Sequence, residues 1–296
     1  MRVLHVDAAR EWRGGQTQLL LLTTHAPGAH VVALPPDALL RRPLEASGVS
    51  VHPVPFRGWI SGGRPLARLA AVLQPDLIAA HTPQAHAHAL KTGLPVVVHR
   101  RVDFRPKGDA ATRARYAAAQ GYVAVSRAVA DVLVSYGVPK DRIEVVYDGI
   151  DVDSFVPDPE GAAALRTTLG LPSSCRLVGA VGALVPHKGH AHLVDAMALL
   201  SRTHADVAAI IAGEGSERRR LEARIRKTRA PVRLLGNVGA AEIPGVLGAI
   251  EVLAHPSVEE GLGQSVLEAM AAGVPVVASR AGGLAESLDD GRNGLL

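Results

Sequence analysis

The residues best suited to chemistry lie close together in the carboxyl-terminal part of the chain. A glycine-rich loop with Gly261 and Gly263 leads into a helix predicted from about Gln264, and two carboxylates, Glu260 and Glu268, flank the loop and the first helical turn. A helix N-terminus presents free backbone N–H groups and the positive end of the helix dipole, which together suit an anion. Carboxylates repel phosphate but accept hydrogen bonds from the hydroxyls of a sugar diol. The stretch therefore predicts a site for a ligand that carries both phosphates and hydroxyls.

Two glutamates at this spacing carry little weight alone, because most glutamates are solvated on the surface. They stand, however, in the longer pattern Glu-Gly-x-Gly-x-x-x-x-Glu-Ala-Met-Ala-x-Gly-x-Pro-Val-Val over residues 260–277. This pattern resembles the donor-site signature of the family 4 retaining glycosyltransferases (glycosyl transferases group 1), which have the GT-B fold. The resemblance implies that Glu260 holds hydroxyls of the donor sugar and that Glu268 holds the ribose diol.

A lysine precedes another predicted helix. Lys188 lies in the segment Gly-Ala-Leu-Val-Pro-His-Lys-Gly, residues 182–189, just before a helix expected near His190. An ammonium at this place can neutralise a diphosphate. The family has both an arginine and a lysine in the corresponding segment, and the arginine position is Ala183 in this chain. Lys188 is therefore the predicted counter-charge, and one of the two cations usual in the family is missing.

Two further loops resemble family segments. Gly14 and Gly15 follow the first predicted strand and could let the backbone approach a phosphate, although the glycines alone fit an ordinary strand–helix turn. The resemblance assigns this loop to donor phosphate and acceptor, and the segment Gly236-Asn237-Val238 to the nucleobase. The complete set of donor-binding residues that it implies is Gly14, Gly15, Lys188, Gly236, Asn237, Val238, Glu260, Gly261, Leu262, Gly263, Gln264, Ser265 and Glu268.

Among the thirteen histidines, His81 and His99 lie at the ends of predicted strands, where parallel sheets place their ligands. His99 matches a family histidine near the donor sugar, so the resemblance implies His99, Glu260 and Lys188 as the catalytic group. His81 is expected on the acceptor side. The dense basic stretch after His99 predicts an acceptor-side anion site, or contact with a membrane surface, formed by Arg100, Arg101 and Arg105; the alternative is a solvated loop. No clustered metal ligands are recognised, so neither a metal nor another cofactor is expected.

Short apolar runs alternate with helical patterns along the whole chain, which predicts parallel sheets covered on both faces. The expected architecture is α/β, with two Rossmann-like doubly wound domains facing a cleft. The N-terminal, acceptor-side domain is expected at 1–156, a linker rich in proline at 157–172, and a donor-binding domain at 173–296. Because family members normally continue through further helices, this second domain is expected to be incomplete at its end. Strands are predicted at residues 3–7, 30–34, 49–54, 77–81, 96–99, 122–126, 143–147, 177–181, 207–212, 232–235, 252–255 and 274–278.

Composition narrows the class of protein. The 296 residues are 48% apolar and 20% charged, which is typical of a globular chain of two domains. One cysteine and no apolar signal region favour the cytoplasm, with peripheral contact at the inner face of the membrane as a further expectation. A net charge of +4 favours anionic partners. Nucleic acid is not expected, because the basic segment 218–229 has no interleaved aromatic residues.

The resemblance implies transfer of a sugar from a nucleoside diphosphate sugar, with retention of anomeric configuration. The expected acceptor is a lipid, a cell-envelope saccharide or a small molecule, and it is expected to be anionic or lipid-linked. Two alternatives stay open: a sugar-nucleotide-binding module without transfer activity, and a GT-B-type nucleotide-sugar epimerase. A two-carboxylate glycosidase is disfavoured, since Glu260 and Glu268 belong to one loop-and-helix unit and not to opposite walls of a cleft.

Overall fold

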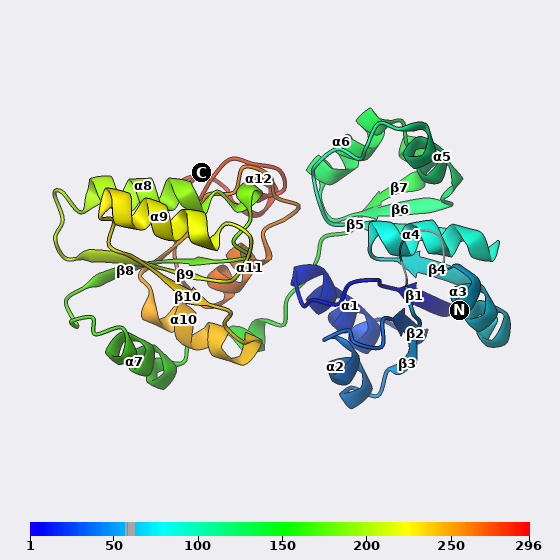
Figure 1. Ribbon diagram of the computed structural model, residues 1–296, viewed down its shortest axis with the longest axis horizontal. Coiled ribbons are helices and arrows are strands. Elements are labelled where there is room, and N and C mark those ends of the chain that lie inside the picture. Colours follow the sequence, from blue (N-terminus) through cyan, green and yellow to red (C-terminus); the bar gives the residue numbers. More distant parts are fainter. Residues whose placement is uncertain (57, 59–62) are drawn as a thin grey trace. The chain divides into compact units, whose positions relative to one another are not determined.

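The computed structural model describes residues 1–56, 58 and 63–296, which form two compact units, Met1–Gly149 and Ile150–Leu296. Each unit contains one parallel sheet with helices packed against it, as Figure 1 shows. The predicted architecture of two doubly wound α/β domains is therefore confirmed.

The first unit is built on a seven-stranded sheet in the order β3-β2-β1-β4-β5-β6-β7. The chain moves outward from β1 in one direction and then returns to its other side, so the strand order reverses between β1 and β4. Ligands in such sheets bind beyond the carboxyl ends of the strands at this switch point. The strands are β1 (Arg2–Val6), β2 (Ala29–Leu34), β3 (Ser50–Pro53), β4 (Leu77–Ala80), β5 (Val96–Arg100), β6 (Gly121–Ala124) and β7 (Ile143–Val145).

Apolar side chains from strands and helices form the core of this unit. One cluster joins Leu19 of the first helix and Leu44 of the second to Val32 and Leu34 of β2. Several helices begin at a side-chain cap, for example Thr82, whose hydroxyl accepts a hydrogen bond from the Ala85 N–H. The helices are α1 (Gly14–His25), α2 (Arg41–Ala46), α3 (Gly63–Leu73), α4 (Pro83–Ala89), α5 (Ala110–Ala118) and α6 (Arg127–Tyr136), with short 3-10 turns η1 (Leu90–Thr92) and η2 (Lys140–Arg142).

The second unit has a five-stranded sheet in the order β10-β9-β8-β11-β12. Here the order reverses between β8 and β11, so the loops that follow these two strands flank the switch point. The strands are β8 (Arg176–Val181), β9 (Val207–Ala212), β10 (Val232–Gly236), β11 (Val252–His255) and β12 (Val276–Ala278).

Successive side chains of the central strands serve opposite faces of this sheet. In β9, Ile211 packs with α8 and α9, whereas Ile210 belongs to the cluster that includes α7, α10 and α11. Figure 1 shows α8 and α9 on one face of the sheet and α7 and α10 on the other. The elements are η3 (Val152–Phe155), α7 (Pro159–Thr168), η4 (Pro186–Lys188), α8 (His190–Leu200), α9 (Arg218–Thr228), η5 (Ala240–Glu242), α10 (Ile243–Ala249), α11 (Gln264–Ala271) and α12 (Leu284–Ser287).

The structure differs from the sequence prediction at the linker expected over 157–172. Most of that segment is helix α7, which packs against α10 inside the second unit, and the division between the units falls after Gly149. The prolines that suggested a linker have another role here. Pro159 occupies the first helical turn, where its missing N–H costs nothing, and the Asp158 carboxylate caps the helix by accepting from the Gly161 N–H.

Within the described parts of the chain, no helix combines the length and the apolar character needed to cross a bilayer.

Candidate functional site

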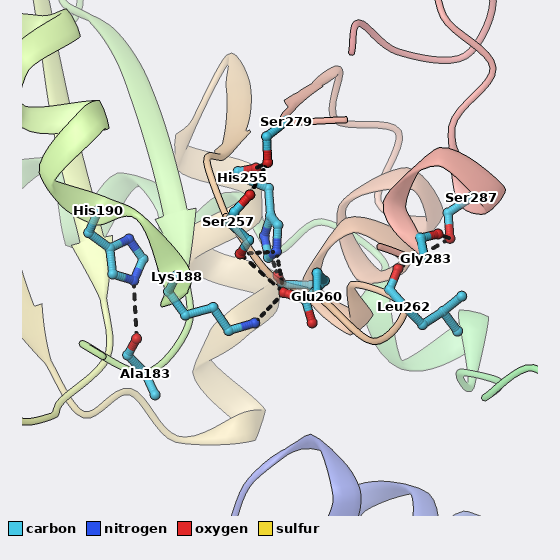
Figure 2. Close-up of polar contacts among 11 residues, drawn as sticks. Ala183, Lys188, His190, His255, Ser257, Glu260, Leu262, Ser279, Gly283 and Ser287 are labelled. Carbon is cyan, nitrogen blue, oxygen red and sulfur yellow. Dashed lines mark hydrogen bonds and ion pairs between the residues drawn. The ribbon is translucent and has the colours of Figure 1, made fainter. Parts of the chain in front are cut away.

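Glu260 lies at the centre of a polar cluster in the second unit, at the switch point between β8 and β11. Its Oε2 accepts hydrogen bonds from Lys188 Nζ at 2.5 Å, His255 Nε2 at 2.8 Å and Ser257 Oγ at 3.1 Å. Figure 2 shows these side chains converging on the carboxylate. Lys188 comes from the loop after β8, and the other three residues come from the end of β11 and its loop. The structure thus brings together the predicted Lys188 and Glu260.

The charge of Glu260 is fixed by this surrounding. Burial alone would raise the pKa of the carboxyl, but the hydrogen bond from His255 and the charge of Lys188 outweigh it and lower the pKa of Glu260 to about 2. The carboxylate is therefore ionised at any neutral pH, so it can accept hydrogen bonds from hydroxyls but cannot deliver a proton.

His255 fixes the direction of the Glu260 carboxylate. The imidazole is 3% exposed, and burial lowers its pKa despite the neighbouring Glu260, which raises it. A neutral ring has one N–H, and because the ionised carboxylate can only accept, that N–H is at Nε2. Nδ1 then accepts from the Ser265 hydroxyl at 3.2 Å, at the start of α11. The ring thereby connects the glutamate to the helix N-terminus.

Backbone packing holds the two loops against each other. The Val258 N–H donates to the His187 carbonyl at 2.8 Å. Gly189 has φ +65°, and a Cβ there would lie 1.9 Å from the Pro256 carbonyl oxygen, so only glycine fits. Lys188 is consequently held beside the loop that carries Glu260.

A third loop, at 281–283, supports the glycine-rich loop from the other side. The Gly283 N–H donates to the Glu260 carbonyl at 3.0 Å, and a Cβ on Gly283 would lie 2.1 Å from the Gly261 carbonyl oxygen. Ser287 Oγ donates to the Leu262 carbonyl at 3.3 Å, as Figure 2 shows. Gly263 is the N-cap of α11 with φ +90°. This packing fixes the backbone that leads into the first turn of α11.

Glu268 lies in the second turn of α11 and is partly buried. Burial raises the pKa of its carboxyl, against the lowering effect of the hydrogen bond from Gln264 Nε2, which lies 3.0 Å from Oε1. The two carboxylates therefore differ: Glu260 is held fully ionised, whereas Glu268 is closer to a protonated state.

The remaining predicted donor-site residues of this unit, Gly236, Asn237 and Val238, lie at the end of β10. Gly236 has φ +84° and accepts at its carbonyl from the Gly213 N–H at 2.7 Å; Asn237 is exposed and Val238 is partly buried. Ala183, at the position of the family arginine, accepts a hydrogen bond at its carbonyl from His190 Nε2 at 3.2 Å.

In the first unit, the predicted residues gather at the switch point between β1 and β4. Gly14 and Gly15 open α1, and a Cβ on Gly15 would lie 3.9 Å from Cδ of Arg101. His99 stacks on His81 with their ring centroids 4.4 Å apart. Burial lowers the pKa of His99 to about 3, so this ring is neutral at physiological pH.

The three predicted acceptor-side arginines do not form one patch. Arg100 is 5% exposed and points into the unit, where Nη1 donates to Tyr116 Oη at 3.0 Å. Its prediction as an acceptor-side residue is corrected, because neighbouring residues of β5 face opposite sides of the sheet. Arg101 pairs with Asp148, with Nε 3.1 Å from the carboxylate. Arg105 is exposed and donates to the Ser135 carbonyl at 3.2 Å.

Sequence reasoning missed His255 and Ser257 as parts of the site. His255 ends β11 and immediately precedes the loop of Glu260. That is the same position relative to a strand that distinguished His81 and His99, so the signal was present in the sequence. Ser257 is fully buried, and no motif indicates it.

No group of three or more side chains suited to hold a metal ion occurs among residues 1–56, 58 and 63–296.

Comparison with known families covers almost the whole chain in two parts. Residues 163–296 match the family model described as Glycosyl transferases group 1. Residues 12–154 match the model described as Glycosyltransferase Family 4. The two matches correspond to the second and the first unit, respectively.

Curated relatives extend the similarity to individual proteins. The chain is 37% identical over 179 residues to the D-inositol 3-phosphate glycosyltransferase of Corynebacterium urealyticum, covering 57% of this chain and 42% of the relative. It is 31% identical over 254 residues to the 2-deoxystreptamine glucosyltransferase of Streptomyces kanamyceticus, covering 84% and 63%. The matched part of the chain thus spans between 42% and 63% of the length of these relatives.

Among solved structures, the chain resembles that of Anabaena Alr3699/HepE in complex with UDP and glucose. The TM-score is 0.85 and the identity 26%, with coverage of 100% of this chain and 85% of that one. The architecture of two Rossmann-like units is the GT-B fold.

Proposed function

The chain belongs to the family 4 glycosyltransferases, and from this premise we propose that it transfers a sugar from a nucleoside diphosphate sugar to an acceptor, with retention of anomeric configuration. The observation that carries the proposal is the contact between Lys188 and Glu260 at the switch point of the second sheet. It sets a cation suited to phosphate beside an anion suited to sugar hydroxyls.

The leaving diphosphate gathers negative charge as the bond to the sugar breaks, so a catalyst must supply positive charge and oriented donors there. In this proposal Lys188 provides the charge. Backbone N–H groups of the loop from Gly261 to Gln264 and of Ser265 at the start of α11 provide the donors. The helix dipole adds to the same effect.

Glu260 holds and orients hydroxyls of the sugar in this proposal. A pKa of about 2 leaves the carboxylate ionised, and the fixed His255 N–H and Lys188 ammonium hold Oε2 in place. The same low pKa means that Glu260 cannot act as the general acid that a glycosidase would need. Glu268, in the second turn of α11, is proposed to hold the ribose diol.

The donor and acceptor classes are proposed from similarity. The Anabaena structure that the chain resembles contains UDP and glucose, so UDP-glucose is the first donor to test. The names of the relatives specify D-inositol 3-phosphate and 2-deoxystreptamine, so we propose a hydroxyl-rich small molecule or its lipid-linked form as the acceptor.

A thermal-shift panel of UDP, GDP, ADP and their sugars tests donor binding. The cognate nucleotide raises the melting temperature by mass action, by an amount that grows with its concentration. Glu268→Ala should erase this shift, and Lys188→Ala should reduce it for diphosphates more than for the nucleoside. A panel without any shift contradicts the proposal.

Product analysis then separates the proposed transfer from its alternatives. The replacement of the family arginine by Ala183 favours, as a second candidate, a module that binds sugar nucleotides without transfer. That candidate predicts a thermal shift but neither transfer nor donor hydrolysis across the acceptor panel. An epimerase would convert the donor without any acceptor. For a transferase, the anomeric configuration of the product, read by NMR, tests retention.

A further inference from the structure

Three histidines of the first unit, His30 in β2, His5 in β1 and His81 directly after β4, form a continuous hydrogen-bonded row. His30 Nδ1 lies 2.9 Å from His5 Nε2, and His5 Nδ1 lies 3.0 Å from His81 Nε2. The row ends at His30 Nε2, 3.1 Å from the Ala26 carbonyl oxygen, and at His81 Nδ1, 3.2 Å from Arg101 Nη1. The parallel register, with Val3 opposite His30 and His5 opposite Ala79, places the three residues on one face of the sheet.

The two ends fix the direction of every bond in the row. A guanidinium can only donate and a carbonyl can only accept. Arg101 must therefore donate to His81 Nδ1, His81 Nε2 to His5 Nδ1, His5 Nε2 to His30 Nδ1, and His30 Nε2 to the Ala26 carbonyl. Each ring is then neutral with its proton on Nε2. An additional proton on any ring would set two donors against each other and break one bond.

The surroundings keep the row in this state. Burial lowers the pKa of His5 to about 3, with further lowering by His30 and Arg101. Burial also lowers the pKa of His81, with the neighbouring His99, Arg101 and His5 acting in the same direction. His5 is 2% exposed. A row whose middle ring is buried and carries no net charge is consistent with its one-way order.

The row terminates on an arginine that retains free donors. Arg101 is held from one side by the Asp148 carboxylate, 3.1 Å from Nε, and from the other by His81. Its side chain is 16% exposed and lies beside Gly15 at the start of α1. Among the described residues, no acceptor is found for the Nη2 amino group of Arg101. A guanidinium fixed in this way is oriented to donate a hydrogen bond to an oxygen of a phosphate or carboxylate.

We propose that His5 and His30 are positioning residues, which act through His81 to hold the Arg101 guanidinium beside the Gly14–Gly15 loop, where Nη2 binds an anionic oxygen of a substrate. The identity of the substrate rests on the proposed transferase function, whereas the histidine row and the anion site do not. No motif in the sequence marks either histidine, because both lie inside strands or at their start. The one-way order of the row also explains why these histidines stay neutral beside an anion site.

The state of the row can be measured without any transfer assay. In the full chain labelled with ¹⁵N-histidine, two-bond ¹⁵N–¹H correlation spectra distinguish the two neutral tautomers. We expect His5, His30 and His81 as Nε2–H tautomers at neutral pH. A proton on Nδ1 of His5 or His81, or a doubly protonated ring there, overturns the proposal.

The positioning role is tested by calorimetric titration of the full chain with inorganic phosphate. We expect Arg101→Gln to weaken phosphate binding roughly tenfold, because a hydrogen bond to a charged group is lost. His30→Leu, which removes an acceptor and a donor from the row, should weaken it in the same direction. His30→Gln, which restores one of each, should recover part of the loss.

His86→Phe is the matched control. His86 is a buried histidine of the same unit that packs on Tyr116 and has no bond to the row. Phosphate affinity should be unchanged in this variant. The proposal fails when Arg101→Gln leaves the affinity unchanged, or when His30→Leu and His86→Phe alter it equally.

Repeating the titration in saturating UDP identifies the source of the anion. Loss of the phosphate response in UDP indicates that Arg101 binds a donor phosphate, whereas its persistence indicates an anionic acceptor. Absence of transfer with every donor, together with the expected tautomers and phosphate response, would remove the proposed function and leave the anion site standing.

Discussion

At the scale of single residues, Glu260 and Glu268 show how environment separates two chemically equal groups. Glu260 receives bonds from Lys188, His255 and Ser257, and its pKa falls to about 2. Burial raises the pKa of Glu268, whose carboxylate accepts a hydrogen bond from Gln264. Glu260 therefore remains an anion beside the Lys188 ammonium, whereas Glu268 is a less readily ionised polar residue within α11.

Glu260→Gln should make stability less dependent on pH in the acid range. The pKa of Glu260 lies at about 2 in the folded state against an ordinary value of 4.5, so its ionisation contributes ~3 kcal/mol to the free energy of unfolding. That contribution is fully present above pH 4.5 and is lost as the pH falls through 4.5 toward 2. Denaturant unfolding of wild type and variant at neutral pH and at about pH 3 measures the difference, which should shrink on acidification.

Glu268→Gln is the natural control for this experiment. Because burial raises the pKa of Glu268, its contribution is present at low pH and is lost as the pH rises through the folded-state pKa. The stability difference from wild type should therefore change with pH in the opposite direction. Parallel profiles for the two variants would contradict the assigned environments.

The charged residues of the site can be predicted from the sequence more readily than the uncharged residues that hydrogen-bond to them. Lys188 and Glu260 stand in patterns that span many positions, and the structure joins them. Consecutive basic residues suggest one patch, but strand alternation buries Arg100, so the prediction for this residue is wrong. Ser257 acts through contacts that the local sequence does not encode, whereas His255 ends a strand in the same way as His99.

At the scale of elements, the twelve predicted strands correspond to the twelve strands found in the described part of the chain, with boundaries that shift by a few residues. Buried parallel strands are continuous apolar runs, so they are visible without an alignment. The proline-rich segment before α7 was harder to interpret, because proline both ends regular structure and starts helices. Only the packing of α7 on α10 distinguishes the two outcomes.

The loop between β8 and α8 depends on one glycine. Gly189→Ala should destabilise the protein by about 2–4 kcal/mol, because a Cβ meets the Pro256 carbonyl at 1.9 Å in a left-handed backbone. Donor binding should weaken as well, since Lys188 precedes the glycine. Denaturant unfolding and UDP titration measure the two effects.

Gly93→Ala separates the backbone strain from the clash. Gly93 also has positive φ, +78°, but a Cβ there meets nothing within 4 Å. This variant should lose only about 1–2 kcal/mol and bind UDP normally. Equal losses in the two variants would mean that contact with Pro256 is unimportant.

At the scale of the whole molecule, the two units differ in how many of their histidines are held neutral. Burial lowers the pKa of His5, His86 and His99 to about 3, and it lowers those of His81 and His88 as well; all five belong to the first unit. In the second unit, burial lowers the pKa of His190 to about 4 and also lowers that of His255. Acidification should therefore lower the free energy of unfolding of the two units by different amounts.

The first unit should lose stability faster than the second as the pH falls below 6.5. Unfolded histidines take up protons near pH 6.5, whereas burial lowers the folded-state pKa to about 3 for His5, His86 and His99 and to about 4 for His190, so the unfolded state binds more protons in between. Each such histidine lowers the free energy of unfolding by up to about 1.4 kcal/mol per pH unit. Hydrogen exchange read by mass spectrometry, corrected for intrinsic rates, resolves the units separately, which a single unfolding curve cannot do. His86→Phe should reduce the slope of the first unit alone, and equal slopes for both units would show that the histidines titrate normally in the folded state.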